Sequence, residues 1–145
     1  MQPHLNSDFS TVTYTVTAHV SAMKSRPVAL SAELSYSAAD PYAVRMSLGA
    51  PAANAVDWVF ARELLAGGTN RPTGSGDVLI FPGHRGNAHT VRVLLRNRAG
   101  TASVELALSE VLAFLRETFA LVADGAESRH VDLDAAVGEI TARRG

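Results

Sequence analysis

Cysteine is absent from this chain of 145 residues. Its absence excludes disulfide bonds, thiol chemistry and metal sites with thiolate ligands, and it agrees with a cytoplasmic protein. Long apolar runs are absent too, since none approaches the roughly 18 residues that a membrane-spanning helix requires. The first ten residues, MQPHLNSDFS, contain neither a cationic flank nor an apolar stretch, so a secretory signal is not expected. We therefore expect a cytoplasmic protein without direct membrane insertion.

An excess of charge of either sign is also missing. Thirteen Lys and Arg residues and 14 Asp and Glu residues give a formal net charge of -1. Such a chain has no general field to attract nucleic acid or anionic lipid, so binding of either would need a local patch. Hydrophobic residues make up 47% and charged residues 19%, as in an ordinary globular domain. We expect one domain over residues 11–145, preceded by a flexible tail over residues 1–10.

Alternation of apolar and polar residues predicts strands in the first half of the chain. Residues 11–20 alternate strictly, and successive side chains of a strand point to opposite faces. The pattern recurs at residues 28–36, 42–48 and 56–60, with turn-forming residues between the runs. Four strands with short connections predict an antiparallel meander. The side chains expected to face the core include Val28, Leu30, Tyr42, Val44, Val56, Trp58 and Phe60.

The second half mixes helices with strands. Residues 61–66 predict a short helix, and Gly67-Gly68 are expected to form its left-handed C-cap. Strands are expected at 78–81, closed by Pro82-Gly83, at 90–96, and at 102–106 after a hairpin turn at 97–100. Apolar residues spaced three and four apart predict an amphipathic helix over residues 108–122, and a last short helix is expected from Asp132 or Asp134.

This order of elements predicts an α+β fold with two antiparallel β-sheets and a long C-terminal amphipathic helix. Strands followed by a helix occur twice, first with the short helix and then with the long one. The two halves share no matching residues, so the duplication is one of architecture.

The segment RPTGSGD, residues 71–77, has the glycines, hydroxyl groups and arginine of a phosphate-binding loop. A Walker-type loop needs lysine directly after its last glycine and leads from a strand into a helix. Here Asp77 follows Gly76, and the chain runs from a helix into a strand. The dinucleotide fingerprint also fails, because Leu79 stands where glycine is required. We interpret the segment as a glycine-shaped turn that leads into a strand.

No arrangement of residues predicts catalysis or a cofactor. Ser75 lies in Gly-Ser-Gly, which is not the five-residue nucleophile elbow of hydrolases. His84 and His89 are five apart in an expected loop without adjoining carboxylates, so surface histidines are a simpler interpretation than metal ligands. We expect no catalytic, metal-binding or cofactor-binding residues. An enzyme of unknown type ranks third among the functional hypotheses, after the two described below.

Binding of single-stranded nucleic acid is the alternative function. Arg92 and Arg96 share one face of an expected strand, and Arg85 and Arg98 are near them in sequence. A basic sheet surface with aromatic residues binds single strands by stacking and phosphate contact. Four arginines are few, however, and the aromatic residues fall mostly on core-facing positions, so nucleic acid is not the expected partner.

Four separated segments give the chain a family resemblance. In this order they resemble the signature segments of the SsgA-like proteins, which are sporulation and cell-division regulators of filamentous actinomycetes, and they are most like the SsgB type. The resemblance covers roughly residues 10–142. The segments are DPYAV (residues 40–44), WVFARELL (58–65), RPTGSGDV (71–78) and DLD (132–134).

The resemblance implies a fold, partners and a location. It implies a Whirly-like fold that assembles as a homotrimer, with no cofactor and no catalytic residue. It implies a non-enzymatic, cytoplasmic protein at division septa, which recruits or positions the tubulin-like protein FtsZ together with SsgA-type proteins. Arg62, Glu63, Arg71 and Asp77 lie in parts of the signature segments that are expected to be exposed, and they are the candidates for the partner surface.

Overall fold

The computed structural model describes residues 10–22, 26–50, 52–129 and 131. The expected N-terminal tail, apart from Ser10, and the expected last helix from Asp132 or Asp134 lie outside the described residues. No helix of the described part is long and apolar enough to cross a membrane. The strands are β1 (Thr11–Ala22), β2 (Val28–Ser37), β3 (Asp40–Leu48), β4 (Val56–Ala61), β5 (Thr73–Ser75), β6 (Val78–Arg85), β7 (Ala88–Asn97) and β8 (Gly100–Ala107), and the helices are α1 (Arg62–Gly68) and α2 (Leu108–Leu121).

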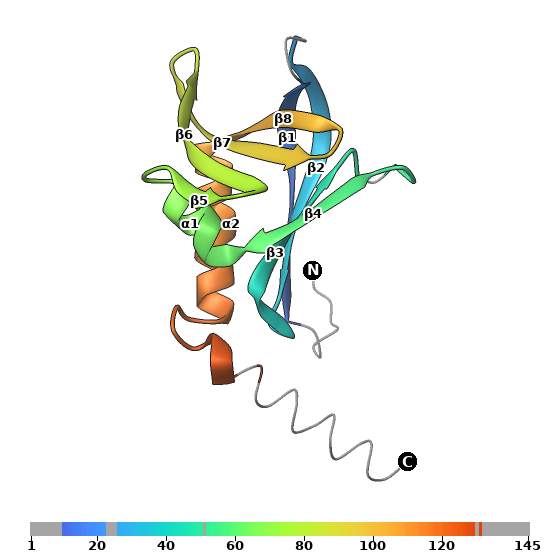
Figure 1. The fold of residues 1–145 in the computed structure, drawn as a ribbon. Helices are drawn as coiled ribbons and strands as arrows, with labels where there is room; N and C mark the ends of the chain where they lie inside the picture. Colours follow the sequence, from blue (N-terminus) through green and yellow to red (C-terminus); the bar gives the residue numbers. More distant parts are fainter. Residues whose placement is uncertain (1–9, 23–25, 51, 130, 132–145) are drawn as a thin grey trace.

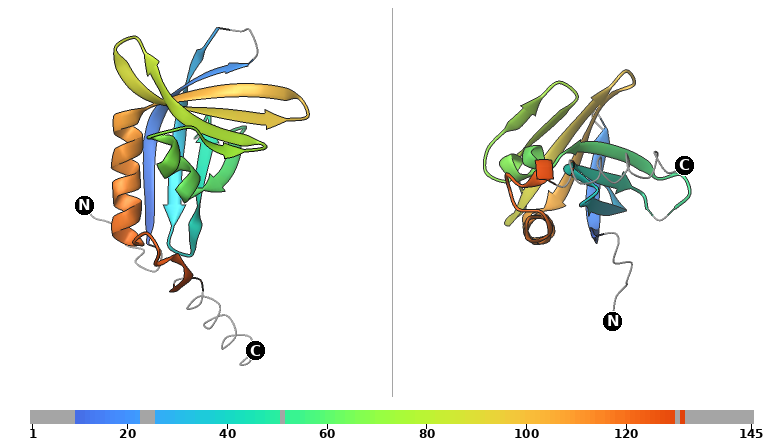
Figure 2. Two further views of the ribbon diagram at one scale, coloured as in Figure 1. Left: turned by 60° about the vertical axis from the view of Figure 1, so that its left-hand side comes forward. Right: turned by 90° about the horizontal axis from the view of Figure 1, so that it is seen from below.

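All eight strands belong to one sheet, in the order β4-β3-β2-β1-β8-β7-β6-β5, and all neighbours are antiparallel. The sheet curls strongly, and α2 lies alongside β1 (Figures 1 and 2). The Thr side chains at positions 11, 13, 15 and 17 of β1 are exposed, whereas Val12, Val16 and Ala18 are buried. The apolar face of the sheet and the buried sides of both helices therefore share a single core.

The expected fold class, α+β with two antiparallel sheets in a Whirly-like arrangement and a long C-terminal helix, is wrong. Strand β1 pairs with β8 from His19↔Glu105 to Ala22↔Ala102, and this pairing joins the strands of both halves into one continuous sheet. Periodicity identifies strands but does not say which strands from distant parts of the chain become neighbours. As a separate element, the helix expected over residues 108–122 is confirmed by α2.

The two glycines that were expected to cap α1 lie inside the helix. Its C-cap is Thr69, whose φ of -73° is right-handed. A Cβ atom on Gly68 would lie 2.2 Å from Cγ2 of Ile80 in β6. Glycine at this position therefore permits close packing of α1 on the sheet, and it does not end the helix.

The interpretation of residues 71–77 as a glycine-shaped turn is confirmed only for the end of the segment, because Thr73–Ser75 form strand β5. Strands β5 and β6 form a hairpin in which Ser75 pairs with Val78, so Gly76 and Asp77 are the turn residues. Gly76 has a φ of 80°, which is left-handed and favours glycine. The segment leads the chain from α1 back into the sheet.

Strand β6 does not end at Pro82-Gly83, as expected, but continues to Arg85. Pro82 pairs with Val91 of β7 on one side, whereas β5 pairs with β6 only as far as Ile80. Beyond Ile80 the other side of β6 is therefore an edge of the sheet within the described residues. Proline is tolerated there because its missing N–H would not have joined a ladder.

Several apolar side chains that were expected in the core are exposed. Val56 is 56% exposed and Tyr42 is 53% exposed, whereas Val44 and Phe60 of the same two strands are buried. Val28 and Leu30 at the start of β2 are exposed as well. Figure 1 shows the start of β4 extending away from both helices, so the alternation of this strand continues there without a layer to cover it.

Candidate functional site

Three of the four candidate residues, Arg62, Glu63 and Arg71, line one pocket of about 320 Å³. The pocket lies between α1, the start of β5 and the segment that follows α2. Asp77 is not among its lining residues, because it lies at the tip of the β5–β6 hairpin. The remaining lining residues are Ala66, Gly67, Thr73, Phe119, Asp124 and Glu127.

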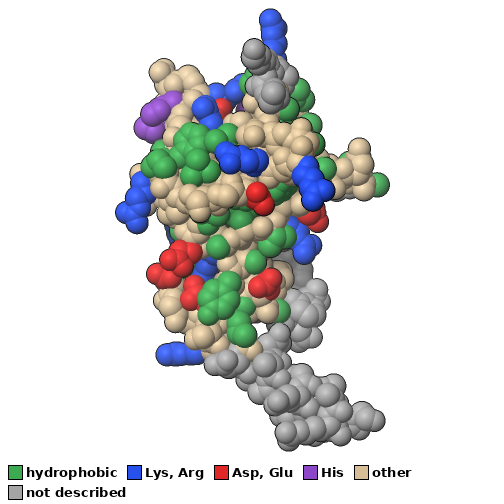
Figure 3. Space-filling model, viewed as in Figure 1, with side chains coloured by type: hydrophobic (Ala, Val, Ile, Leu, Met, Phe, Trp, Pro, Cys, Tyr) green, Lys and Arg blue, Asp and Glu red, His purple; other side chains and the backbone are tan. Residues whose placement is uncertain are grey.

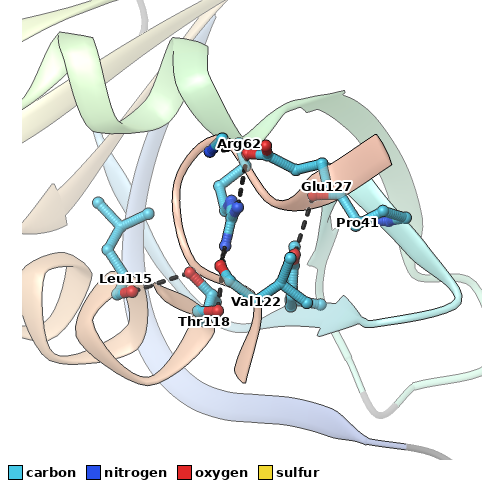
Figure 4. A network of polar contacts seen from close by, with 8 residues as sticks. Pro41, Arg62, Leu115, Thr118, Val122 and Glu127 are labelled. Atoms are coloured by element: carbon cyan, nitrogen blue, oxygen red, sulfur yellow. Dashed lines mark hydrogen bonds and ion pairs between the residues drawn. The ribbon is translucent and has the colours of Figure 1, made fainter. Parts of the chain in front are cut away.

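Arg62, the first residue of α1, is almost completely buried, with 1% of its surface exposed. Its Nη1 atom donates hydrogen bonds to the carbonyl oxygens of Thr118, at 3.0 Å, and Val122, at 2.8 Å (Figure 4). These carbonyls belong to the end of α2, where the helix has negative partial charge, and the Thr118 carbonyl also accepts a hydrogen bond from the backbone N–H of Val122. The Arg62 side chain therefore supplies the cation that this end of α2 favours.

The second guanidinium nitrogen of Arg62 forms an ion pair with Glu127. Nη2 lies 2.7 Å from Oε2 of Glu127, and the backbone N–H of Gly125 donates to Oε1 at 2.9 Å. The hydrogen bond from Arg62 is the main cause that lowers the pKa of Glu127 from its ordinary value. Glu127 therefore remains ionised and holds the segment after α2 against α1.

Two aromatic rings complete the surroundings of Arg62. Its Cζ atom lies 4.1 Å from the ring centroid of Phe119 and 4.8 Å from that of Tyr36, distances at which a cation is attracted to a ring face. The Tyr36 hydroxyl donates a hydrogen bond to the carbonyl oxygen of Pro41 at 2.9 Å. Burial raises the pKa of Tyr36, against the opposing charge of Arg62, so the phenol remains neutral.

These contacts define the Arg62 network: Tyr36, Pro41, Arg62, Thr118, Phe119, Val122 and Glu127. It connects the strand pair β2–β3, α1 and the end of α2, which lie far apart in sequence. Pro41 and Arg62 come from two different segments of the family resemblance.

The expectation that Arg62 is exposed was wrong. Arg62 lies three residues before the buried Leu65 on α1, and residues three apart share a helix face. This spacing was the available signal, although the three partners of the guanidinium, 56 to 65 residues later in the chain, could not be read from it. Glu63, Arg71 and Asp77 are exposed, as expected, and their role in binding stays a prediction.

The accessible part of the pocket is charged. Glu63, Asp124 and Arg71 are exposed, and no ion pair joins them to another described residue. Figure 3 shows acidic side chains gathered on the face where α1 and the end of α2 lie in Figure 1. Such a surface is suited to recognition of a partner with complementary charges.

The histidines and the serine considered for chemistry are on the surface. His84 and His89 face each other across the β6–β7 hairpin with ring centroids 4.7 Å apart, and both are exposed. Among the described residues, no group of three or more His, Asp or Glu side chains is arranged to hold a metal ion. Ser75 is exposed in β5.

The arginines of the alternative nucleic-acid surface are partly neutralised within the fold. Arg92 forms an ion pair with Glu105 at 2.9 Å, and Arg85 approaches the same carboxylate at 3.8 Å. Burial alone would raise the pKa of Glu105, but hydrogen bonds from Arg92 and Thr90 and the two arginine charges outweigh it and lower the pKa. Arg96 and Arg98 are the two arginines of this group that are exposed and form no ion pair in the described structure.

Glu105 was not among the residues singled out from the sequence. The hairpin turn between β7 and β8 places Glu105 directly opposite Arg92, so counting back from that turn would have found the pair.

Residues 30–127 match the model of a protein family described as "Streptomyces sporulation and cell division protein, SsgA". The sporulation-specific cell division protein SsgB of Frankia casuarinae is 43% identical over 109 residues, which cover 75% of this chain and 76% of that protein. SsgB of Streptomyces coelicolor is 42% identical over 123 residues, with 85% and 88% covered.

A solved structure has the same fold. The crystal structure of an SsgA-like sporulation-specific cell division protein from Thermobifida fusca superposes with a TM-score of 0.84 at 36% sequence identity. The match covers 93% of this chain and 98% of that one. The curled eight-stranded sheet is therefore shared with a relative, and it replaces the two-sheet arrangement expected from the sequence.

Proposed function

Since this chain belongs to the SsgA family of sporulation and cell-division proteins, we propose that it acts in septation by recruiting or positioning FtsZ at septum sites. The names of its relatives support a role in sporulation-specific cell division. The observation that carries the proposed mechanism is the pocket beside α1, where exposed Glu63 and Arg71 flank the buried Arg62 network.

The protein acts in this proposal by binding and not by catalysis. The Arg62 network fixes α1 against the end of α2, so that Glu63 and Arg71 are presented from a rigid support. A preorganised charged surface binds with a smaller entropy cost, because its side chains and backbone need not be ordered on association. The proposed partners are FtsZ and SsgA-type proteins, and the proposed location is the cytoplasm at division septa.

Self-association as a homotrimer belongs to the same proposal. The exposed residues of α2 are Ser109, Leu112, Arg116, Glu117 and Ala120, so Leu112 and Ala120 are the only apolar ones. The sheet is therefore the better of the two self-association surfaces considered for this chain. Sedimentation velocity over a range of protein concentrations measures the assembly, and a single species with the mass of a monomer would contradict a trimer.

Charge reversal tests the partner surface. We expect Glu63→Lys and Arg71→Glu each to weaken binding to purified FtsZ by about tenfold, which corresponds to about 1.4 kcal/mol. Asp77→Lys tests whether the surface extends to the hairpin tip. Arg45→Glu is the control, because Arg45 is exposed on β3 and does not line this pocket. Biolayer interferometry measures affinity, and circular dichroism checks the fold of each variant.

The outcomes separate three situations. Unchanged affinity for Glu63→Lys and Arg71→Glu would exclude this pocket as the FtsZ surface. An equal loss of affinity in Arg45→Glu would indicate that the overall charge of the protein determines binding and that this pocket is not a defined site. If the variants change binding to an SsgA-type protein but not binding to FtsZ, the pocket would be assigned to the SsgA-type protein.

Single-stranded nucleic acid remains the alternative, and the pairing of Arg92 and Arg85 with Glu105 speaks against it. A salt-dependent gel shift with oligonucleotides distinguishes the two functions. Tight binding that is lost on replacement of Arg92 and Arg96 would favour the alternative.

A further inference from the structure

The tip of the β6–β7 hairpin carries two histidines, His84 and His89, that the proposed partner surface does not use. Both were expected in a loop, but the structure places them on paired strands, where His84 is directly opposite His89. The strands are joined by a two-residue turn, Gly86-Asn87. Gly86 has a φ of 63°, as the first residue of such a turn requires. Figures 1 and 2 show this tip projecting from the body of the molecule.

The hydrogen-bond pattern of the hairpin brings the two imidazole rings together. In a two-residue hairpin the pair that flanks the turn, here Arg85 and Ala88, exchanges main-chain hydrogen bonds. The next pair, His84 and His89, is then of the non-hydrogen-bonded type, in which opposite side chains lie closer together. Their ring centroids are 4.7 Å apart, and the ring planes are inclined by 51°. The backbone therefore holds two imidazoles side by side before any ligand binds.

This separation is the one that two ligands of a single metal ion need. A histidine nitrogen binds Zn²⁺ at about 2.0–2.1 Å. With each ring centroid about 1.1 Å behind its nitrogen, two rings that meet an ion at about 90° to about 109° have centroids about 4.5–5.2 Å apart. The observed distance lies within this range. An ion shared by the two rings therefore requires rotation of the side chains but no movement of the backbone.

Both rings are available for binding. They are exposed, and within the described part of the chain no hydrogen bond or ion pair engages either imidazole. Figure 3 shows histidine side chains at the surface in the region where this hairpin lies in Figure 1. Successive side chains of a strand point to opposite faces, so Arg85 is on the other face from His84. There its guanidinium approaches Glu105 at 3.8 Å, which directs its positive charge away from the ring pair.

The chemistry of the two ligands selects the kind of ion. Imidazole suits copper, nickel and zinc, whereas Mg²⁺ and Ca²⁺ prefer oxygen ligands. Among the divalent ions of the first row, the affinity of a nitrogen site is highest for Cu²⁺. Two protein ligands are fewer than the three or four of catalytic and structural zinc sites. Water or donor groups of a partner would therefore complete the coordination.

We propose that His84 and His89 form a binding site for one divalent transition-metal ion, with Cu²⁺ bound more tightly than Ni²⁺ or Zn²⁺. The ion joins β6 to β7 at the free end of their hairpin and keeps open coordination positions toward solvent. The site is separate from the pocket of Glu63 and Arg71, so it goes beyond the proposed function and is tested independently.

Calorimetric titration of the full chain, without an affinity tag, with CuCl₂, NiCl₂, ZnCl₂ and MgCl₂ measures the binding. We expect His84→Ala and His89→Ala each to weaken Cu²⁺ binding by at least about tenfold, and the double variant to lose little more, because a chelate needs both rings. His19→Ala, on β1, is the control and should bind as the native chain does. Losses that simply add, or Mg²⁺ binding as tight as Cu²⁺ binding, would overturn the proposal.

A rearranged variant keeps the number of histidines constant. His89→Ala combined with Ala88→His moves the second ring by one position and so to the opposite face of the hairpin. We expect this variant to bind Cu²⁺ as weakly as His89→Ala alone. Positions 88 and 89 are exposed, and circular dichroism in the presence of EDTA checks that the fold is retained. An affinity equal to that of the native chain would show adventitious binding to single surface histidines and would overturn the proposal.

Spectroscopy locates the ion. Electron paramagnetic resonance of the Cu²⁺-loaded chain should show coupling to the nitrogens of two imidazoles, and NMR should show amide signals of the β6–β7 tip broadened first. Coupling to one imidazole only, or broadening confined to other parts of the chain, would place the ion elsewhere and overturn the assignment.

Discussion

The guanidinium of Arg62 lies 2.7 Å from the carboxylate of Glu127, 65 residues further along the chain. This pair closes the segment after α2 onto α1, and the same guanidinium binds two carbonyls at the end of α2. An arginine is well suited to this position, because its planar group donates in several directions at once. A lysine would reach one of these acceptors and leave others without a donor.

Replacement of Arg62 by methionine should destabilise the fold strongly. The change retains an apolar stem but removes the donors to Thr118, Val122 and Glu127. We expect the free energy of unfolding to fall by about 2–4 kcal/mol, because breaking a buried pair leaves the remaining groups uncompensated. Urea denaturation measures the change. Arg71→Met, at an exposed position, should remain within about 0.5 kcal/mol of the native chain, and equal losses would contradict a special role for Arg62.

The ion pair also predicts a dependence of stability on acid. The pKa of Glu127 is lowered in the folded protein from its ordinary value of 4.5, chiefly by the hydrogen bond from Arg62. A carboxyl with a lowered folded pKa contributes stability above its unfolded pKa, and that contribution is lost as the pH falls through the folded pKa. We expect the stability difference between the native chain and Glu127→Gln to be largest above about pH 5 and to shrink below pH 4.5. Denaturation curves over this range test the sign; a difference that grows in acid would refute it.

Close packing of α1 on β6 predicts an asymmetry between two neighbouring glycines. A Cβ atom at Gly68 would collide with Cγ2 and Cβ of Ile80, at 2.2 and 2.5 Å. We expect Gly68→Ala to cost about 1–3 kcal/mol of stability, since overpacking forces the helix or strand to shift. At Gly67 the nearest atoms belong to the Thr73 side chain, at 2.9 and 3.0 Å, and the helix gains from alanine. Thermal unfolding should therefore show a much smaller effect for Gly67→Ala, and a reversed order would mean that α1 is not held against Ile80.

The carboxylate of Glu105 predicts weak binding of nucleic acid. It pairs with Arg92 and Arg85 on the outer face of the sheet. A phosphate group would therefore have to compete with this carboxylate for both arginines. We expect no retention of oligo-dT by the native chain at physiological salt, and a modest gain with Glu105→Gln, which releases both arginines. Gel shifts at several salt concentrations test this, with Glu110→Gln as a control of equal charge change on α2. Tight binding by the native chain would favour the alternative function.

Local patterns in the sequence were sufficient for most of the secondary structure. The alternation at residues 11–20, the hairpin turn at 97–100 and the helical spacing over 108–122 correspond to β1, the β7–β8 hairpin and α2. Each of these signals depends on residues a few positions apart, which the chain order alone supplies. The turn at Gly76-Asp77 belongs to the same class, because the conformational preference of glycine is local, whereas the strand Thr73–Ser75 before it was not expected.

Only the tertiary structure decided how these pieces meet. Whether β1 neighbours β8 depends on the free energy of pairing strands about 85 positions apart, so two sheets were expected where one continuous sheet formed. The burial of Arg62 and the exposure of Val56 have the same origin, since both depend on which distant element covers the position. The sequence by itself thus determined the elements, the absence of cysteine chemistry and the family resemblance. The joining of all strands into one curled sheet and the Arg62 network arise from contacts between residues remote in the chain, which no local pattern specifies.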